Sequence, residues 1–203
     1  MFENDMFIID DFYDDPYAIR NLALKTRYLE FENHNVPGFE SEQSFYAENH
    51  VNTFKSLVQK EIVINPQKYV YGKFRYSLRE SFSKSEMHID SPDWAALVYL
   101  TQDVDCKGGL GIYKHKESGL SKIPKTGEEF NEIGFRDLQD LDNKITLPVT
   151  KDKEAWELLE FIPMKFNRMI LFRGSRYFHS ITEKFGDKIE SARLSHNFFF
   201  NEK

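Results

Sequence analysis

Two histidines and one aspartate are the residues of this 203-residue chain whose spacing best suits metal chemistry. His88 and Asp90 lie two positions apart, and residues at i and i+2 of a β-strand project from the same face. One imidazole and one carboxylate could therefore reach the same cation. His179, in a strand-like run that follows the turn residues Gly174 and Ser175, is a candidate third ligand. Two histidines and a carboxylate on one face of an octahedron leave positions open, as in non-haem iron(II) sites.

The pair His88–Asp90 is weak evidence by itself. The chain contains 33 acidic residues and six histidines, so a His-x-acid match is expected by chance. A second match, from His115 to Glu117, occurs in a charged stretch, and we interpret His115 as a surface residue. A histidine and an aspartate at the end of a strand can also simply bond each other, so a structural role for the pair stays open.

Arg193 and Ser195 follow His179 along the chain and share one face of a predicted strand. A guanidinium offers a planar fork to a carboxylate, and a neighbouring hydroxyl adds one more donor. Taken alone, an arginine on a strand is more often an ion-pair partner. The joint pattern is hard to obtain by accident, because it combines the pair His88–Asp90, a third ligand at His179 and then a carboxylate-binding pair.

The elements expected to position these residues are two helices followed by many short strands. One helix begins at Pro16, capped by Asp14 or Asp15, and runs to about Lys25. A second covers 51–62, where apolar residues recur at helical spacing. Further helices are expected near 128–141 and 153–161, and strands at 7–9, 74–79, 95–100, 109–113, 166–172, 177–182 and 193–200. This order predicts a mainly β fold with flanking helices, a β-sandwich or jelly roll.

Composition and charge limit the class of protein. The net charge of −6 gives no general attraction to nucleic acid or to an anionic membrane. The single cysteine, Cys106, allows neither an internal disulfide nor a thiolate zinc cluster. We predict one soluble, cytoplasmic domain over 1–203, with N-terminal helical support at 1–68 and a β core at 69–203. A polar insertion at about 115–160 interrupts that core.

The order of the motifs resembles that of the iron(II)/2-oxoglutarate-dependent dioxygenases. The intervening segments look most like the prolyl-hydroxylase branch, in which an apolar strand ends in Tyr-Leu, here Tyr99-Leu100, and Gly-Gly, here Gly108-Gly109, enters the next strand. More narrowly, the stretch 113–119 is similar to an uncharacterised bacterial family of that superfamily. The resemblance covers roughly 70–115 and 164–200.

The resemblance implies a double-stranded β-helix, a cupin-like jelly roll, with Fe(II) at its open end. It implies hydroxylation of an unactivated C–H bond in a small molecule or a peptidyl residue, with O2 and 2-oxoglutarate consumed and succinate and CO2 released. Nucleic-acid demethylases of the superfamily carry a further arginine after the one at Arg193, and its absence here disfavours nucleic acid. The implied metal ligands and catalytic residues are His88, Asp90 and His179, and the implied 2-oxoglutarate residues are Arg193, Ser195 and Tyr99.

Two other classes of protein remain open. A zinc hydrolase also uses two histidines and one carboxylate with an open position. The sequence contains no His-Glu-x-x-His motif, and a hydrolase would leave Arg193 and Ser195 without a role. A non-catalytic jelly-roll binding module, in which the polar cluster is structural, is the other alternative.

Overall fold

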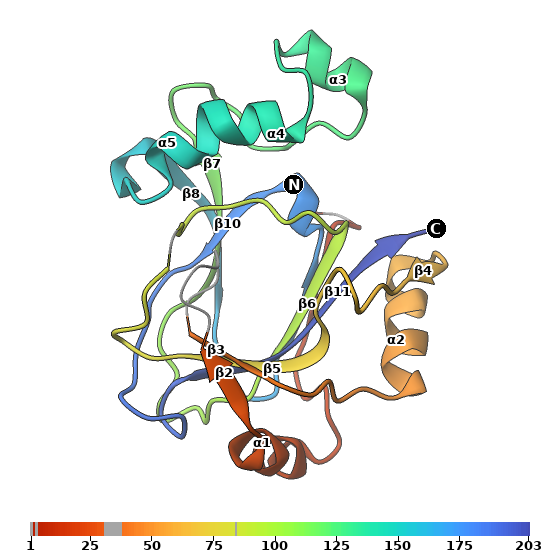
Figure 1. Ribbon diagram of the computed structural model, residues 1–203, viewed down its shortest axis with the longest axis vertical. Coiled ribbons are helices and arrows are strands. Elements are labelled where there is room, and N and C mark those ends of the chain that lie inside the picture. The colour runs from red at the N-terminus through yellow and green to blue at the C-terminus, as the bar shows by residue number, and fades with distance from the viewer. Residues whose placement is uncertain (1, 3, 31–37, 84) are drawn as a thin grey trace.

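The computed structural model describes residues 2, 4–30, 38–83 and 85–203 as two antiparallel β-sheets with helices around them (Figure 1). The strands of the larger sheet are β1 Met6–Ile9, β2 Tyr28–Glu30, β3 Phe39–Ser41, β4 Ile62–Val63, β5 Tyr71–Ser77, β6 Trp94–Tyr99, β9 Met169–Phe172 and β11 Arg193–Glu202. Their order is β1-β9-β6-β11-β5-β3-β2, and β4 pairs with the end of β11. The smaller sheet has the order β10-β7-β8, formed by β7 Gly109–His115, β8 Trp156–Pro163 and β10 Phe178–Ile181.

The chain winds back and forth between the two sheets. It leaves the larger sheet after β5, bridges to the smaller sheet at His88, and returns through β6. Strands β7 and β8 belong to the smaller sheet, β9 to the larger, β10 to the smaller and β11 to the larger. This winding is the jelly roll, or double-stranded β-helix, that the sequence predicted.

Strand β6 contributes side chains to two hydrophobic cores, one on each face of the larger sheet. Its alternate residues point to opposite faces of the larger sheet. Ala95, Leu97 and Tyr99 pack between the two sheets. Trp94, Ala96 and Val98 pack on the outer face, in a cluster that contains Phe54 of a covering helix. Both faces of β6 are therefore buried, and its sequence is apolar throughout.

The helices lie outside the two sheets. Helix α1, Pro16–Lys25, begins with Asp15, whose side chain accepts a hydrogen bond from the Ala18 N–H, as predicted. Helix α2, Glu48–Val58, covers the outer face of the larger sheet (Figure 1). Three short helices, α3 Gly127–Glu132, α4 Leu138–Leu141 and α5 Leu147–Val149, stand at one end of the molecule, at the top of Figure 1. Single helical turns cover Asp142–Thr146, Lys153–Ala155 and Gly174–Arg176. Among the described residues, none of the helices has the length and apolar character that a membrane-spanning helix needs.

The insertion differs most from the prediction. The helix predicted at 153–161 is wrong, because only one turn forms and β8 begins at Trp156. Its backbone pairs along the whole of β7, which outweighs the helix-favouring Glu and Leu residues. The helix predicted at 128–141 is broken in two around Gly134, whose φ of 83° is incompatible with a helix.

The N-terminal segment also differs in part from its predicted helical character. Strand β1 pairs with β9 and strand β3 with β5, so this segment extends the larger sheet at both of its edges. Helix α2 ends at Val58 because Gln59 adopts a left-handed conformation with φ 54°, and Ile62 therefore lies in β4.

Candidate metal centre

The three predicted ligands converge where the two sheets meet. His88 and His179 are cross-strand partners, and each backbone N–H donates to the other's carbonyl, at 3.2 and 3.0 Å. The Asp90 N–H donates to the Gly174 carbonyl, at 3.0 Å, in the turn that follows β9. One ligand atom from each of the three side chains lies within 4.8 Å of the others. Residues from distant parts of the sequence are thereby brought within reach of one cation.

Backbone carbonyls fix the orientation of both imidazole rings. Nδ1 of His88 lies 3.0 Å from the Glu86 carbonyl, and Nδ1 of His179 lies 2.9 Å from the Tyr177 carbonyl. A carbonyl only accepts hydrogen bonds, so each Nδ1 must carry the proton. In the neutral rings, both Nε2 atoms therefore present lone pairs toward Asp90. Metal-binding histidines characteristically donate their other ring N–H in this way.

Asp90 faces these two nitrogens with oxygen atoms that also carry lone pairs. Oδ2 lies 3.2 Å from Nε2 of His179 without a well-aligned hydrogen bond, and Oδ1 lies 3.9 Å from Nε2 of His88. Three acceptors pointing at one small volume repel one another unless a positive charge lies between them. A proton on His179 or a divalent cation would supply that charge.

The electrostatics of the cluster agree with a proton held on His179. Burial lowers the pKa of His88 to about 4, and repulsion from a protonated His179 acts in the same direction. Burial alone would lower the pKa of His179, but attraction to Asp90 outweighs it and raises the pKa. Burial would raise the pKa of Asp90, and attraction to the histidines lowers it instead. Without a metal, a proton in the cluster therefore favours His179 over His88.

Metal affinity is therefore expected to depend on pH through His179. An imidazole binds a metal only in its neutral form, so a cation must displace this proton. Because the pKa of His179 is raised from 6.5, affinity should fall about tenfold per pH unit below the raised pKa and level off above it. Titration with Mn(II) from pH 5.5 to 8.5 measures this slope. A pH-independent affinity over that range would contradict the assignment of His179 as a ligand.

Arg193 lies in the same cavity as the three ligands. It is the first residue of β11, and its guanidinium lies 5.3 Å from the centre of the Tyr99 ring. The cavity has a volume of about 160 Å³, and His88, Asp90, His179 and Arg193 all line it. Arg193 is 8% exposed, and among the described residues no carboxylate lies within ion-pair distance of it. A buried cation without a counter-ion is costly, so the site is suited to an anionic ligand.

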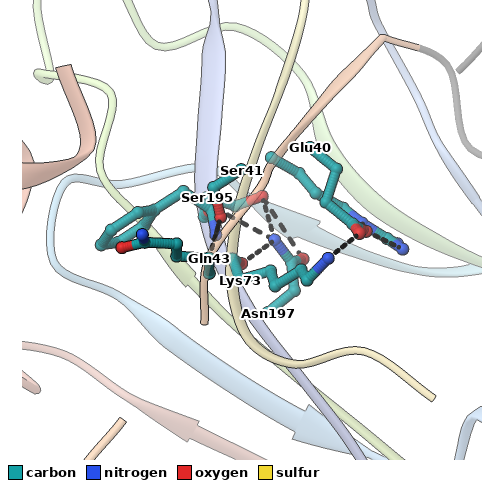
Figure 2. A network of polar contacts seen from close by, with 8 residues as sticks. Glu40, Ser41, Gln43, Lys73, Ser195 and Asn197 are labelled. Atoms are coloured by element: carbon teal, nitrogen blue, oxygen red, sulfur yellow. Dashed lines mark hydrogen bonds and ion pairs between the residues drawn. The ribbon is translucent and has the colours of Figure 1, made fainter. Parts of the chain in front are cut away.

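Ser195 and Tyr99, the other two predicted co-substrate residues, lie on the same sheet face as Arg193. Ser195 is paired with Tyr99 across β11 and β6. Neither side chain lines the cavity, and both are fully buried. The Ser195 hydroxyl exchanges hydrogen bonds with the Asn197 amide (Figure 2), and Asn197 does line the cavity. Burial raises the pKa of Tyr99 although the charge of Arg193 opposes this, so its hydroxyl stays protonated.

A buried charge cluster beside these residues was not predicted. Glu40 on β3 pairs with Lys73 at 2.9 Å (Figure 2) and with Arg75 at 2.6 Å, both on β5. Arg75 lines the cavity and is paired with a carboxylate, so it is not a solvated residue of the strand. The alternation of residues along β5 could have indicated that Arg75 points inward. Arg75 lies directly across from Ser195, and directly paired residues share one face of a sheet. Glu40 could not be foreseen, since it comes from a distant strand.

His115 is not the surface residue that its charged neighbours predicted. It is 3% exposed and stacks near Trp156, with ring centres 5.1 Å apart. Its Nδ1 lies 2.9 Å from the Ser118 hydroxyl. Among the described residues it does not belong to a group of potential metal ligands. His115 is buried at the base of the insertion.

A family model described as "Family of unknown function (DUF6445)" matches residues 2–200, almost the whole chain. This match agrees with the narrow resemblance to an uncharacterised family that the sequence indicated. No curated protein matches the chain in sequence.

Three solved structures are similar to the chain at low identity. IDO from Bacillus thuringiensis is 13% identical, with a TM-score of 0.45, and the match covers 100% of this chain and 92% of that one. HygX from Streptomyces hygroscopicus, with nickel and 2-oxoglutarate bound, is 10% identical, with a TM-score of 0.46 and coverage of 100% and 85%. TqaL, an Fe(II)/α-ketoglutarate-dependent dioxygenase, is 10% identical, with a TM-score of 0.44 and coverage of 98% and 83%. At these identities and scores, function has to follow from the chain's own residues.

Proposed function

We propose that the chain, which belongs to the family of unknown function whose model matches residues 2–200, is an iron(II)- and 2-oxoglutarate-dependent dioxygenase. One observation carries the proposal. A single cavity is lined by three converging side chains that could together hold a metal ion and by a buried arginine that has no carboxylate partner among the described residues. A divalent cation would balance the lone pairs of the three side chains, and a dicarboxylate would balance the positive charge of Arg193.

The residues present suit iron(II) and 2-oxoglutarate. Two imidazoles with fixed Nε2 orientation and one carboxylate form the ligand set typical of non-haem iron(II) oxygenases, with positions left open. Arg193 offers a planar fork for the remote carboxylate of the co-substrate. Tyr99 supports the guanidinium through its ring face, and Ser195 holds Asn197 at the cavity wall.

Bound iron(II) and 2-oxoglutarate would supply the oxidative chemistry, which couples decarboxylation to succinate and CO2 with transfer of an oxygen atom from O2 to a C–H bond. The protein would supply position and charge. Asp90 and the two histidines would hold one face of the metal, and Arg193 would orient the co-substrate across the cavity. The apolar wall, which includes Leu97, Leu110 and Phe172, would exclude water from the reacting atoms. The substrate we propose is a small molecule or a peptidyl residue that becomes hydroxylated.

A spectroscopic titration tests the proposal directly. Anaerobic protein loaded with Fe(II) should develop a weak visible charge-transfer band when 2-oxoglutarate is added, because a chelated keto acid on a ferrous centre absorbs there. Zn(II)-loaded protein is the control and should stay colourless, since zinc is not redox-active and cannot transfer an electron to the keto acid. If 2-oxoglutarate changes neither the spectrum nor the heat of titration of the ferrous protein, the proposal fails. Hydrolytic activity of the zinc form would then favour a hydrolase.

A further inference from the structure

Gly174 lies against the carboxylate of Asp90. A methyl group built on its Cα would stand 2.2 Å from Oδ2 of Asp90 and 2.9 Å from both Cβ and Cγ. Contacts below about 3 Å between such atoms are strongly repulsive. Gly174 does not have a positive φ, so its backbone conformation is open to any residue. The three atoms nearest to such a methyl group all belong to the side chain of Asp90.

The backbone around Gly174 is fastened on both sides. The Arg173 N–H donates to the Asp5 carbonyl at 2.9 Å, and the Gly174 carbonyl accepts from the Asp90 N–H at 3.0 Å. The Arg173 guanidinium pairs with Asp5 at 2.8 Å and with Glu202 at 2.5 Å. It also lies 4.4 Å from the centre of the Trp94 ring. A methyl group at Gly174 is therefore expected to displace the side chain of Asp90 rather than the backbone of the turn.

We propose that Gly174 is a positioning residue for the metal site, because its lack of a side chain leaves the space in which Asp90 can point at His88 and His179. The inference rests on the proposed metal site and adds a residue that touches neither metal nor co-substrate. It also gives Arg173 a function, since the ion pairs of Arg173 hold the turn that carries Gly174.

Metal titration of Gly174→Ala tests the inference. Changes to residues that orient a ligand typically lower metal affinity 10- to 100-fold. Titration with Mn(II), and with Fe(II) under anaerobic conditions, should show a loss of about that size. Gly127→Ala is the matched control, because Gly127 also lacks a positive φ and a methyl group there would meet nothing within 4 Å. This control should bind both metals as the parent does.

The outcomes separate this inference from the proposed function. If the parent protein binds neither metal, the metal site itself is wrong. If the parent binds and Gly174→Ala binds equally well, the site stands and the positioning role is overturned.

A double-mutant comparison keeps the inference testable if Gly174→Ala folds poorly. Asp90→Gly removes the three atoms that lie nearest to the new methyl group. In metal-free protein, Gly174→Ala should therefore lower the melting temperature in the parent background and much less in the Asp90→Gly background. Such non-additivity is expected of residues that act through direct contact. Equal losses in both backgrounds would show that Gly174 acts on the turn and not on Asp90.

Discussion

Asp90→Ala should abolish tight iron(II) binding. The change removes the only anionic ligand of the cluster and leaves two neutral imidazoles facing a divalent cation. Since changes outside the ligand shell already cost 10- to 100-fold in metal affinity, loss of a charged ligand should cost more than about 100-fold. Anaerobic Fe(II) titration measures the loss. Succinate production without substrate, the slow uncoupled turnover of such sites, should disappear with it.

Melting curves of the same variant distinguish a metal site from a structural cluster. In the metal-free protein the buried charge of Asp90 is balanced only by a proton on His179, and that proton can leave when Asp90 is removed, so the melting temperature should stay unchanged or rise. A non-catalytic binding module predicts the opposite, a destabilised metal-free protein and no stabilisation of the parent by metal. Asp14→Ala, at an exposed position, is the control and should keep the full metal-induced shift. Equal metal-induced shifts in the parent and in Asp90→Ala would refute the ligand assignment.

Arg193→Ala should weaken 2-oxoglutarate binding and leave metal binding nearly intact. Truncating one partner of a buried charge pair typically costs roughly 2–5 kcal/mol, which corresponds to a loss of about 30- to several thousand-fold in affinity. Arg193→Lys should lie between the parent and the alanine variant, because an ammonium keeps the charge and loses the planar fork. Calorimetric titration of 2-oxoglutarate into the metal-loaded proteins gives both values.

The control for this series is Arg168→Ala. Arg168 is a largely buried arginine paired with Asp10 at 2.7 Å, and it does not line the cavity. Its loss should lower stability without changing 2-oxoglutarate affinity. The ligand-free Arg193→Ala protein, by contrast, should melt no lower than the parent, since it loses a buried charge that lacks a counter-ion. Normal 2-oxoglutarate binding by Arg193→Ala would remove Arg193 from the co-substrate assignment.

Strand periodicity and motif order predicted the parts of the site that depend on local parity. His88 and Asp90 two residues apart, and Arg193 at the start of an inward-facing strand, needed only the two-residue repeat of a β-strand. The repeat assumes that His88 and Asp90 lie on a regular strand, and the structure differs there. Only a single bridge, between His88 and His179, forms at this position. Sequence order also could not reveal that Ser195 bonds Asn197 instead of lining the cavity.

The residues that escaped prediction all depend on contacts between distant segments. Glu40 meets Arg75 only because β3 pairs with β5, and Gly174 meets Asp90 only where the turn after β9 reaches the other sheet. His115 is polar and has charged neighbours, yet Trp156 from the far side of the insertion covers it. Local composition describes the neighbours in sequence, whereas burial is decided by neighbours in space.

The position of β11 has a consequence for how the protein is made. This last strand lies between β5 and β6, which pair with it on either side and not with each other. Until it has left the ribosome, a nascent chain carries two long strands with open inner edges, the kind of surface that pairs with other chains. Pairing over such sequence separations is also slow. The closure of the cavity and the arrival of Arg193 thus both wait for the synthesis of β11, and a chain cut short before β11 would be exposed to aggregation.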